Sequence, residues 1–497
     1  MHSDEAGRRR YLAYALILAA ALTAYAHHHI AQTIHQPSRL VAIDTLGFCW
    51  LAFSLIAAHT HIDVRPSRRQ TRQLDERRVT VIVPLKNEDP TTFRALLDSL
   101  AAQSRLPQRL HIIDNGSTNT DCQRAFHQWA ATSPAGMQVE YTVTGSIGKR
   151  AAQVLAFDAD PTADIFVTLD SDTVLDPNAI AEGIAPFSRT DVTSVAGLLL
   201  CLNQSKNLLT RLVDLSFVMS FLNGRAAWSR LGSVVVNCGG LAFYRADVVR
   251  KYQDQYVTQT VWGRRVASGD DRMLTCYALL EGRTVIQERA IGYTLLPERM
   301  SHLVRQRIRW WRSFFWGGTW LIKTFPITKP AWGMVLWQFA SFALYTFVLP
   351  LVLIVHPVET RGLAVPFLIY MAGLSYVRSV RYLVVRRPDQ SYASQLGSFA
   401  LAPLSSLLNV FLCSILQYAG LLTFLKTGWS TRATVEVGIT GQPDLAPATV
   451  IGVQGTDPDA PTTPIPVITG ATAPLAKLYD PITEITLETH LPRHART

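Results

Sequence analysis

The chain has 497 residues, of which 48% are hydrophobic and 17% are charged, whereas about 25% of residues are charged in a typical soluble domain. This composition excludes a collagen-like repeat, disorder throughout and a chain built only of soluble domains. The six cysteines are scattered without close pairs, which favours free thiols over a disulfide scaffold. The net charge of +10 suits nucleic acid, anionic lipid or an anionic substrate. No zinc-finger spacing or RNA-binding signature is present, so no nucleic-acid partner is expected.

Apolar runs near both ends of the chain predict membrane segments. They cover residues 11–26, 40–58, 332–355, 363–377 and 396–425. Arginine clusters follow the second and fourth runs, which places those loops in the cytoplasm. The first run is short enough to be a cleaved signal peptide instead, and the last could be one helix or an interfacial segment followed by a helix. We expect a multi-pass protein of the plasma membrane, in contact with the lipid bilayer, with six segments.

This pattern divides the chain into four regions. Residues 1–65 would form a transmembrane hairpin, 66–325 a cytoplasmic domain and 326–432 a second membrane bundle. Residues 433–497 are rich in proline and threonine. Such a segment cannot bury enough apolar surface to fold, so we expect a disordered tail.

The cytoplasmic region alternates between predicted strands and helices. Strands are predicted at 79–83, where Pro84 would end the strand, at 110–113 and at 165–169. Helices are predicted at 91–103 and 149–157. Short apolar strands separated by helices predict an α/β fold with a mostly parallel sheet covered on both faces. In such sheets ligands bind beyond the carboxyl ends of the strands.

Polar residues follow each of the three predicted strands. The first strand leads to Asn87 and Glu88, the second to Asp114, and the third to Asp170 and Asp172. Each group alone could be a turn or a cap, but three in register predict a shared site. Two carboxylates at one strand end would suit Mg²⁺ or Mn²⁺, which bind carboxylate and phosphate oxygens.

A glycine-rich stretch ends in Gly148 and Lys149. It is not a Walker motif, because Arg150 stands where serine or threonine would follow. Lys149 at a helix start could neutralise a diphosphate, or the stretch could be a turn before an exposed basic helix.

Further along, a predicted apolar strand at 235–236 meets a flexible turn with Cys238, Gly239 and Gly240, where backbone could approach a sugar closely. Asp270 and Asp271 are adjacent acids, of which only one could be held as a general base. The alternative is an N-cap for the helix that follows.

A basic aromatic stretch follows, in which Gln306, Arg309 and Trp310 share one face of a predicted helix. Arg309 could grip a diphosphate, and Trp310 offers a flat surface on which a sugar could stack. An interfacial membrane anchor would have the same composition, and both roles can hold at once.

These residues together resemble the processive family 2 glycosyltransferases, the membrane synthases of hyaluronan, chitin, chitooligosaccharide nodulation factor and cellulose. The resemblance covers about residues 79–320 and the flanking apolar runs. Four motifs are most similar to hyaluronan synthases: Gly148-Lys149-Arg150-x-Ala152-Gln153, Cys238-x-Gly240, Ser268-Gly269-Asp270-Asp271-Arg272 and Trp429-Ser430-Thr431-Arg432. Cellulose synthases usually carry Thr-Glu-Asp at the third motif.

The resemblance implies a GT-A-type nucleotide-sugar-binding domain inserted between transmembrane helices. It further implies an inverting enzyme that polymerises UDP-sugars and moves the growing polysaccharide across the membrane. Asp172 and Asp170 would hold Mg²⁺ or Mn²⁺, and Asp271, beside Asp270, would be the catalytic base. The residues implied to bind substrate or nucleotide are Asn87, Glu88, Asp114, Lys149, Asp170, Cys238, Gln306, Arg309 and Trp310.

Two departures from the family pattern concern the sugar more than the catalysis. Asn115 replaces the second acid of Asp-Asp-Gly-Ser, and the usual Cys-Ser-Gly-Pro turn is Cys238-Gly239-Gly240-Leu241. A hyaluronan-like product is expected. The alternatives are a chitin-like or glucose-containing polymer, or a transporter or sensor that binds nucleotide sugar without turning it over.

Overall fold

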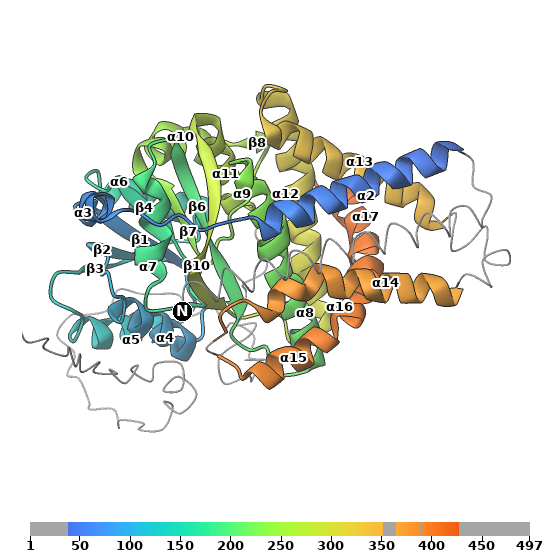
Figure 1. Ribbon diagram of the computed structural model, residues 1–497. Helices are drawn as coiled ribbons and strands as arrows, with labels where there is room; N and C mark the ends of the chain where they lie inside the picture. The colour runs from blue at the N-terminus through green and yellow to red at the C-terminus, as the bar shows by residue number, and fades with distance from the viewer. Residues whose placement is uncertain (1–37, 351–363, 388, 427–497) are drawn as a thin grey trace, which may run out of the picture.

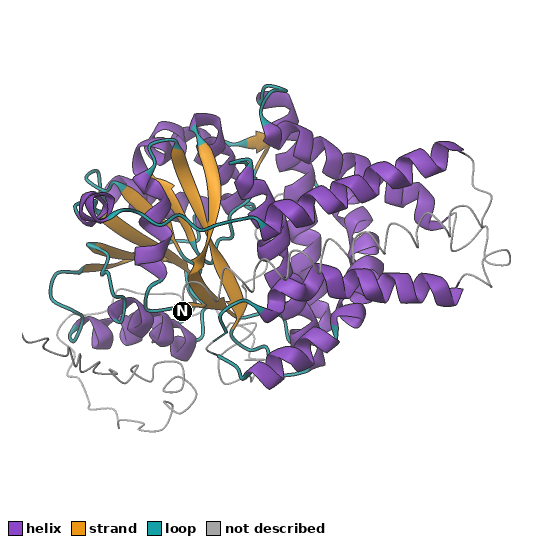
Figure 2. Ribbon diagram, in the orientation of Figure 1, coloured by secondary structure: helices purple, strands orange, loops and turns teal. Residues whose placement is uncertain are grey.

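The computed structural model describes residues 38–350, 364–387 and 389–426. A twisted sheet with helices on both faces lies beside a group of long helices that extend away from it (Figure 1). Figure 2 shows how strands gather at one end of the molecule and helices alone at the other. The first apolar run, at 11–26, and the tail at 433–497 lie outside the described residues.

The main sheet has the strand order β3-β2-β1-β4-β7-β6-β10-β5. Its strands are β1 (Val79–Leu85), β2 (Arg109–Asn115), β3 (Gln138–Thr144), β4 (Ile165–Thr168), β5 (Thr173–Leu175), β6 (Val192–Cys201), β7 (Ala242–Arg245) and β10 (Arg283–Thr294). β3, β2, β1 and β4 pair in parallel, as do β6 and β10. β7 is antiparallel to β4 and β6, and β5 is antiparallel to β10. Four of the seven pairings are parallel, so the expected mostly parallel sheet is present, with β7 and β5 as its antiparallel strands.

Helices cover both faces of this sheet. One face packs against α4 (Pro90–Ala101), α5 (Asp121–Ala130), α7 (Ala179–Ile184) and α8 (Leu208–Met219). The other packs against α6 (Lys149–Ala159), α10 (Ala246–Thr258) and α11 (Asp270–Glu281). The two apolar cores arise because neighbouring strand residues point to opposite faces: Val81 and Val83 lie in the first core and Ile82 in the second.

Other elements join the sheet region or form the helical group. Near the sheet are α3 (Arg68–Asp75), the 3₁₀ turn η1 (Ala185–Ser188), the π-helical η2 (Ser220–Arg225), α9 (Ala226–Arg230) and the hairpin of β8 (Thr260–Val261) with β9 (Arg264–Arg265). The helical group contains α2 (Ser38–His59), α12 (Met300–Thr324), α13 (Pro330–Pro350), α14 (Ala364–Ser379), η5 (Val380–Leu383), α15 (Tyr392–Ala400), α16 (Ala402–Leu408), η6 (Asn409–Cys413) and α17 (Ser414–Leu422).

Strand β1 continues through Pro84, so the expected end at this residue was wrong. Its pairing with β4 stops at Ile82, opposite Thr168, whereas its pairing with β2 runs on to Leu85. Proline lacks an N–H and is tolerated where one side of a strand is unpaired. Strand β3 was missed, because its residues are mostly half-buried and polar.

The predicted strand at 235–236 is also wrong, since this segment is irregular and the strand β7 begins only at Ala242. Side chains form hydrogen bonds with its backbone groups instead. Arg225 Nε donates to Val236 O at 2.9 Å, and Asn237 N donates to Thr275 Oγ1 at 2.9 Å. A segment whose polar groups are already satisfied does not need a neighbouring strand.

Within the described ranges, one helix is long and apolar enough to cross a membrane, Ala402–Leu422. The last apolar run breaks at Leu401, which separates α15 from the helix that continues through α16, η6 and α17. This arrangement favours a short segment followed by a long helix over a single helix across 396–425.

Candidate active site

Three of the predicted polar groups meet at one edge of the sheet. β2, β1 and β4 are adjacent and parallel, so their carboxyl ends coincide. Ser117 N donates to Asp114 Oδ1 at 2.8 Å, and Asn87 N donates to Ser117 Oγ at 3.0 Å. Ser171 Oγ donates to Glu88 Oε2 at 2.6 Å. The prediction that these three strand ends lie at one edge of the sheet is confirmed.

Asp114 is only 4% exposed. Its second oxygen accepts a hydrogen bond from Tyr141 Oη at 2.9 Å. Asn87 has a left-handed backbone with φ of 46°, and its Oδ1 accepts from Thr118 N at 2.8 Å. Such backbone strain persists where the surroundings fix it. The first two strand ends thus form one rigid, hydrogen-bonded turn cluster.

Lys149 lies between two carboxylates. Its Nζ is 2.7 Å from Asp170 Oδ1 and 2.8 Å from Asp270 Oδ2. Burial alone would lower the pKa of Lys149, but the two carboxylates outweigh it and raise the pKa well above its usual value. The ammonium group therefore stays charged and links the end of β4 to the start of α11.

The turn before β7 closes over this pair. A Cβ atom at Gly239 would lie 3.1 Å from Asp170 Oδ2 and 3.4 Å from Lys149 Nζ. Any larger residue would crowd the carboxylate. Next to it, burial raises the pKa of the Cys238 thiol to about 12, so this side chain is a neutral thiol at physiological pH.

The adjacent acids at the start of α11 have opposite pKa shifts. Burial would raise the pKa of Asp270, but the charge of Lys149 and its hydrogen bond lower it. Burial, followed by the charge of Asp270, raises the pKa of Asp271 to about 6. Environments that push two pKa values apart commonly mark acid and base roles. Asp270 is thus fixed as an anion, while Asp271 is suited to exchange a proton near neutral pH.

The backbone at Gly269 requires glycine. Its φ of 66° is left-handed, and a Cβ atom there would lie 2.4 Å from Ser313 Oγ and 2.7 Å from Trp316 Cζ2. Both neighbours belong to α12. No side chain caps α11, so the alternative role of this motif as a side-chain N-cap does not hold, and α12 passes directly beside the two acids.

The predicted residues of α12 lie on its N-terminal half. Gln306 Oε1 is buried and accepts no hydrogen bond from any residue in the described ranges. The ring of Trp310 stacks on Phe217 with centroids 6.3 Å apart, and the Arg307 guanidinium lies 4.6 Å from the Trp310 centroid. Arg309 lies between Gln306 and Trp310 in the sequence of α12. Trp310 is thus held by protein neighbours that the sequence did not indicate.

The expected metal ligands supply two carboxylates. One third of the Asp170 side chain is exposed, and Asp172 Oδ1 lies 3.5 Å from Thr294 Oγ1. In the described part of the chain, no three His, Cys, Asp or Glu residues are grouped to hold a metal ion. Two carboxylates still fit Mg²⁺ or Mn²⁺, because these ions commonly take their remaining ligands from substrate phosphates and water.

Comparison with known proteins identifies the family. A family model described as "Glycosyltransferase like family 2" matches residues 77–313. A hyaluronan synthase from Streptococcus pyogenes is 32% identical over 368 residues, which cover 72% of this chain and 84% of that protein. The chain belongs to glycosyltransferase family 2. This confirms the resemblance found in the motifs, and a family 2 glycosyltransferase is a transferase enzyme.

Further proteins are similar to this glycosyltransferase. An N-acetylglucosaminyltransferase from Neorhizobium galegae is 30% identical over 365 residues, covering 72% of this chain and 81% of that protein. The solved structure of the mannosyltransferase PcManGT from Pyrobaculum calidifontis, in complex with GDP-Man and Mn²⁺, aligns with 85% of this chain and 100% of that chain, at 18% identity and a TM-score of 0.45. The glycosyltransferase domain has a GT-A-like α/β fold with a mixed sheet.

No role was predicted for Arg150, although the structure places it against the loop that carries the acid motif of this glycosyltransferase. Its Nη1 donates to Tyr256 O at 3.0 Å and to Gln259 Oε1 at 2.7 Å. Its Nη2 donates to Ser268 O at 2.8 Å. Arg150 is 3% exposed, so these bonds fix the loop that leads into α11. The signal in the sequence was its place in the Gly148-Lys149-Arg150 motif.

Proposed function

We propose that this family 2 glycosyltransferase is a processive, inverting synthase that polymerises a β-linked polysaccharide from UDP-sugars. The observation that carries the proposal is the pair of opposite pKa shifts in Asp270 and Asp271, next to a lysine that bridges the strand end and the acid motif. A general base works best when its pKa lies near the operating pH.

In the proposed reaction, Asp271 takes the proton from an acceptor hydroxyl. The hydroxyl oxygen then forms a bond to the anomeric carbon of the donor sugar, while the bond from that carbon to the UDP oxygen breaks. UDP leaves from the opposite side with the bonding electrons. A single displacement inverts the anomeric centre, so an α-linked donor yields a β-linked product.

The donor would lie over the carboxyl ends of the strands. Asp114, with Asn87 and Glu88 beside it, would face the uridine. Lys149 would neutralise negative charge on the nucleotide. Its hydrogen bond to Asp170 supports a position next to the diphosphate.

The α12 helix and the turn before β7 would complete the site, with α12 serving both the diphosphate and the acceptor. Arg309 and Gln306 would bind the diphosphate, and the buried, unsatisfied Gln306 Oε1 supports a ligand contact there. Trp310 would pack against the acceptor sugar, near Cys238.

Asp172 and Asp170 would hold Mg²⁺ or Mn²⁺. When bound, the ion supplies positive charge that stabilises the leaving diphosphate. The residues of the chain supply the remaining steps: they orient the donor, hold the acceptor and accept its proton.

We propose a hyaluronan-like product made from UDP-N-acetylglucosamine and UDP-glucuronic acid. The hyaluronan synthase relative supports this choice. A chitin-like polymer is the second candidate, favoured by the N-acetylglucosaminyltransferase relative. A glucose-containing polymer is a further alternative. Membership of a transferase family argues against a transporter or sensor without turnover.

The enzyme would lie in the plasma membrane as a multi-pass protein, with the glycosyltransferase domain in the cytoplasm. The apolar helix Ala402–Leu422 supports at least one crossing. The helical group would then give the growing polysaccharide a path through the bilayer.

Combining donors tests the proposal. Membranes containing the full chain would receive UDP-N-acetylglucosamine alone, UDP-glucuronic acid alone, or both, and the product would be digested with a hyaluronan-specific lyase. We expect polymer only with both donors, and complete digestion. Polymer from UDP-N-acetylglucosamine alone would replace the hyaluronan assignment with the chitin-like one.

A further inference from the structure

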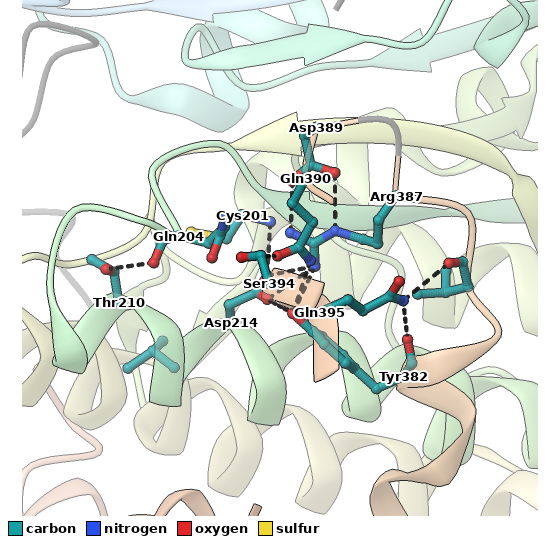
Figure 3. A network of polar contacts seen from close by, with 12 residues as sticks. Cys201, Gln204, Thr210, Asp214, Tyr382, Arg387, Asp389, Gln390, Ser394 and Gln395 are labelled. Atoms are coloured by element: carbon teal, nitrogen blue, oxygen red, sulfur yellow. Dashed lines mark hydrogen bonds and ion pairs between the residues drawn. The ribbon is translucent and has the colours of Figure 1, made fainter. Parts of the chain in front are cut away.

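A buried polar network joins the segment after α14 to α8 (Figure 3). The side chains of Arg387 and Asp214 are both 0% exposed. Arg387 Nη1 lies 3.1 Å from Asp214 Oδ1 and 2.9 Å from Oδ2, and Tyr382 Oη donates to Asp214 Oδ2 at 2.6 Å. Asp214 Oδ1 also accepts from Cys201 N at 3.1 Å. One carboxylate therefore ties α8 to the end of β6 and to residues 380–387, which we call the strap.

The strap is fixed at a second point by Arg381. Its Nη2 lies 2.8 Å from both carboxylate oxygens of Glu288 on β10. The same guanidinium donates to Leu222 O in η2. Arg381 and Glu288 are largely buried, at 9% and 17% exposure of their side chains. The strap thus forms buried polar contacts with α8 and with η2, the π-helical segment that continues α8.

The helix held by the strap leads directly to the acceptor side of the site. Phe217, one turn after Asp214 on α8, stacks on Trp310. Arg225, at the end of η2, donates to Val236 O, two residues before Cys238. Both of these contacts would shift if α8 rotated or slid against β6. The π-helical turn between them is a feature that often occurs near functional sites.

The chemistry of the network suits positioning better than stabilisation. A buried ion pair loses much of its attraction to the cost of removing two charges from water, and apolar residues of similar size are often as stabilising. An ion pair and its hydrogen bonds do, however, allow one geometry, whereas apolar contacts allow several. The Asp214 oxygens accept from three donors, one at the end of β6 and two on the strap, and this favours a single register for α8.

We propose that Asp214, Tyr382 and Arg387 are positioning residues that hold Trp310 and the Cys238 turn in place against the growing chain. The strap would thereby couple the C-terminal helices to the acceptor side of the site. This inference rests on the proposed function as a polysaccharide synthase.

The test compares full-length wild type with Asp214→Asn, Arg387→Gln and the double variant, purified in detergent and supplied with both UDP-sugars. Asp191→Asn is the matched control, because Asp191 forms an exposed ion pair with Arg189, at 47% and 51% exposure. UDP release, sugar incorporated into polymer, product length on gels and KM for each donor would be measured for every variant.

We expect the KM for both donors to stay within about twofold of wild type, since no strap residue lies on the donor side. The product should become several-fold shorter. UDP release should exceed sugar incorporation, because water then replaces the misplaced acceptor hydroxyl at the anomeric carbon. The double variant should be no worse than the poorer single variant, because the pair acts as a unit.

Folded variants with wild-type product length and matched UDP release would overturn the proposal. So would a lower yield of active enzyme whose remaining activity is wild-type in every respect, since that outcome indicates a structural role alone. If Asp214→Asn does not fold, Tyr382→Phe removes one hydrogen bond and leaves the ion pair, and it should shift product length in the same direction by less. Failure of the proposed function is seen separately, as a wild type that makes no polymer.

Discussion

Replacing Asp271 with asparagine separates the proposed catalytic role of this residue from its effect on stability. The change keeps the size of the side chain and keeps an oxygen that can accept from Arg272 N, as Asp271 Oδ1 does at 2.8 Å. It removes the group that would accept the proton. A general base contributes about 10²- to 10⁴-fold to a rate, so we expect polymer synthesis to fall by that amount while UDP-sugar binding persists.

The same change should make the folded protein more stable at neutral pH. The pKa of Asp271 is raised from 3.8 to about 6, and each pKa unit corresponds to about 1.4 kcal/mol. The folded state therefore disfavours the ionised carboxylate by roughly 3 kcal/mol above pH 6, an upper value that shrinks with any solvent screening. Because the folded pKa is the higher one, this cost is absent below about pH 4 and grows as the pH rises to 6. Asparagine cannot ionise and escapes it.

The assay would follow UDP release by the wild type from pH 5 to 8, and thermal unfolding of wild type and variant at pH 4.5 and 7.5. We expect wild-type activity to fall as the pH drops through about 6, and the gain in unfolding temperature of the variant to be larger at pH 7.5. Asp254→Asn, on the exposed surface of α10, is the matched control and should change neither. A flat activity profile down to pH 5, or full activity in Asp271→Asn, would refute the reasoning.

Three further predictions concern the remaining parts of the site. Lys149→Met removes the cation between two carboxylates, and since a charge-assisted hydrogen bond contributes about 1.5–3 kcal/mol, the KM for UDP-sugar should rise at least tenfold; an unchanged KM would remove Lys149 from the donor side. Gly269→Ala should lower both activity and unfolding temperature more than Gly263→Ala, because both positions have positive φ but only Gly269 has neighbours within 4 Å of an added Cβ; equal losses would show that the contact with α12 is unimportant. Chelation with EDTA should abolish UDP release, and Mg²⁺ or Mn²⁺ should restore it in the wild type but less well in Asp172→Asn; activity that survives chelation would contradict the metal role.

The sequence predicted β1, β2 and β4, which are neighbours in the sheet, for a physical reason. β1, β2 and β4 are short, have mostly apolar centres and are followed by polar turns, a pattern with few alternative structures. Parallel strands bring their ends together, so the cluster of Asn87, Asp114 and Asp170 could be inferred without coordinates. The antiparallel β7 could not, because four residues between a glycine turn and a helix carry almost no periodicity.

The contacts between side chains that are distant in the sequence could not be predicted. That Lys149 would bridge Asp170 and Asp270 depends on the first residues of α6 and α11 lying close together, which no local pattern specifies. The stacking of Phe217 on Trp310 likewise joins residues 93 positions apart. The motif at 269–271 indicated two acids, but only their three-dimensional neighbours show that the pKa of Asp270 is lowered and that of Asp271 is raised.

The most direct test of the central claim is the length of the product made by purified full-length enzyme from both UDP-sugars. Labelled donor would be supplied and the product resolved on gels before and after treatment with hyaluronan-specific lyase. We predict long chains, formed while most enzyme molecules still hold their first product, and converted by the lyase to short fragments. Release of UDP with transfer of single sugars only, and no polymer at any donor ratio, would contradict the account.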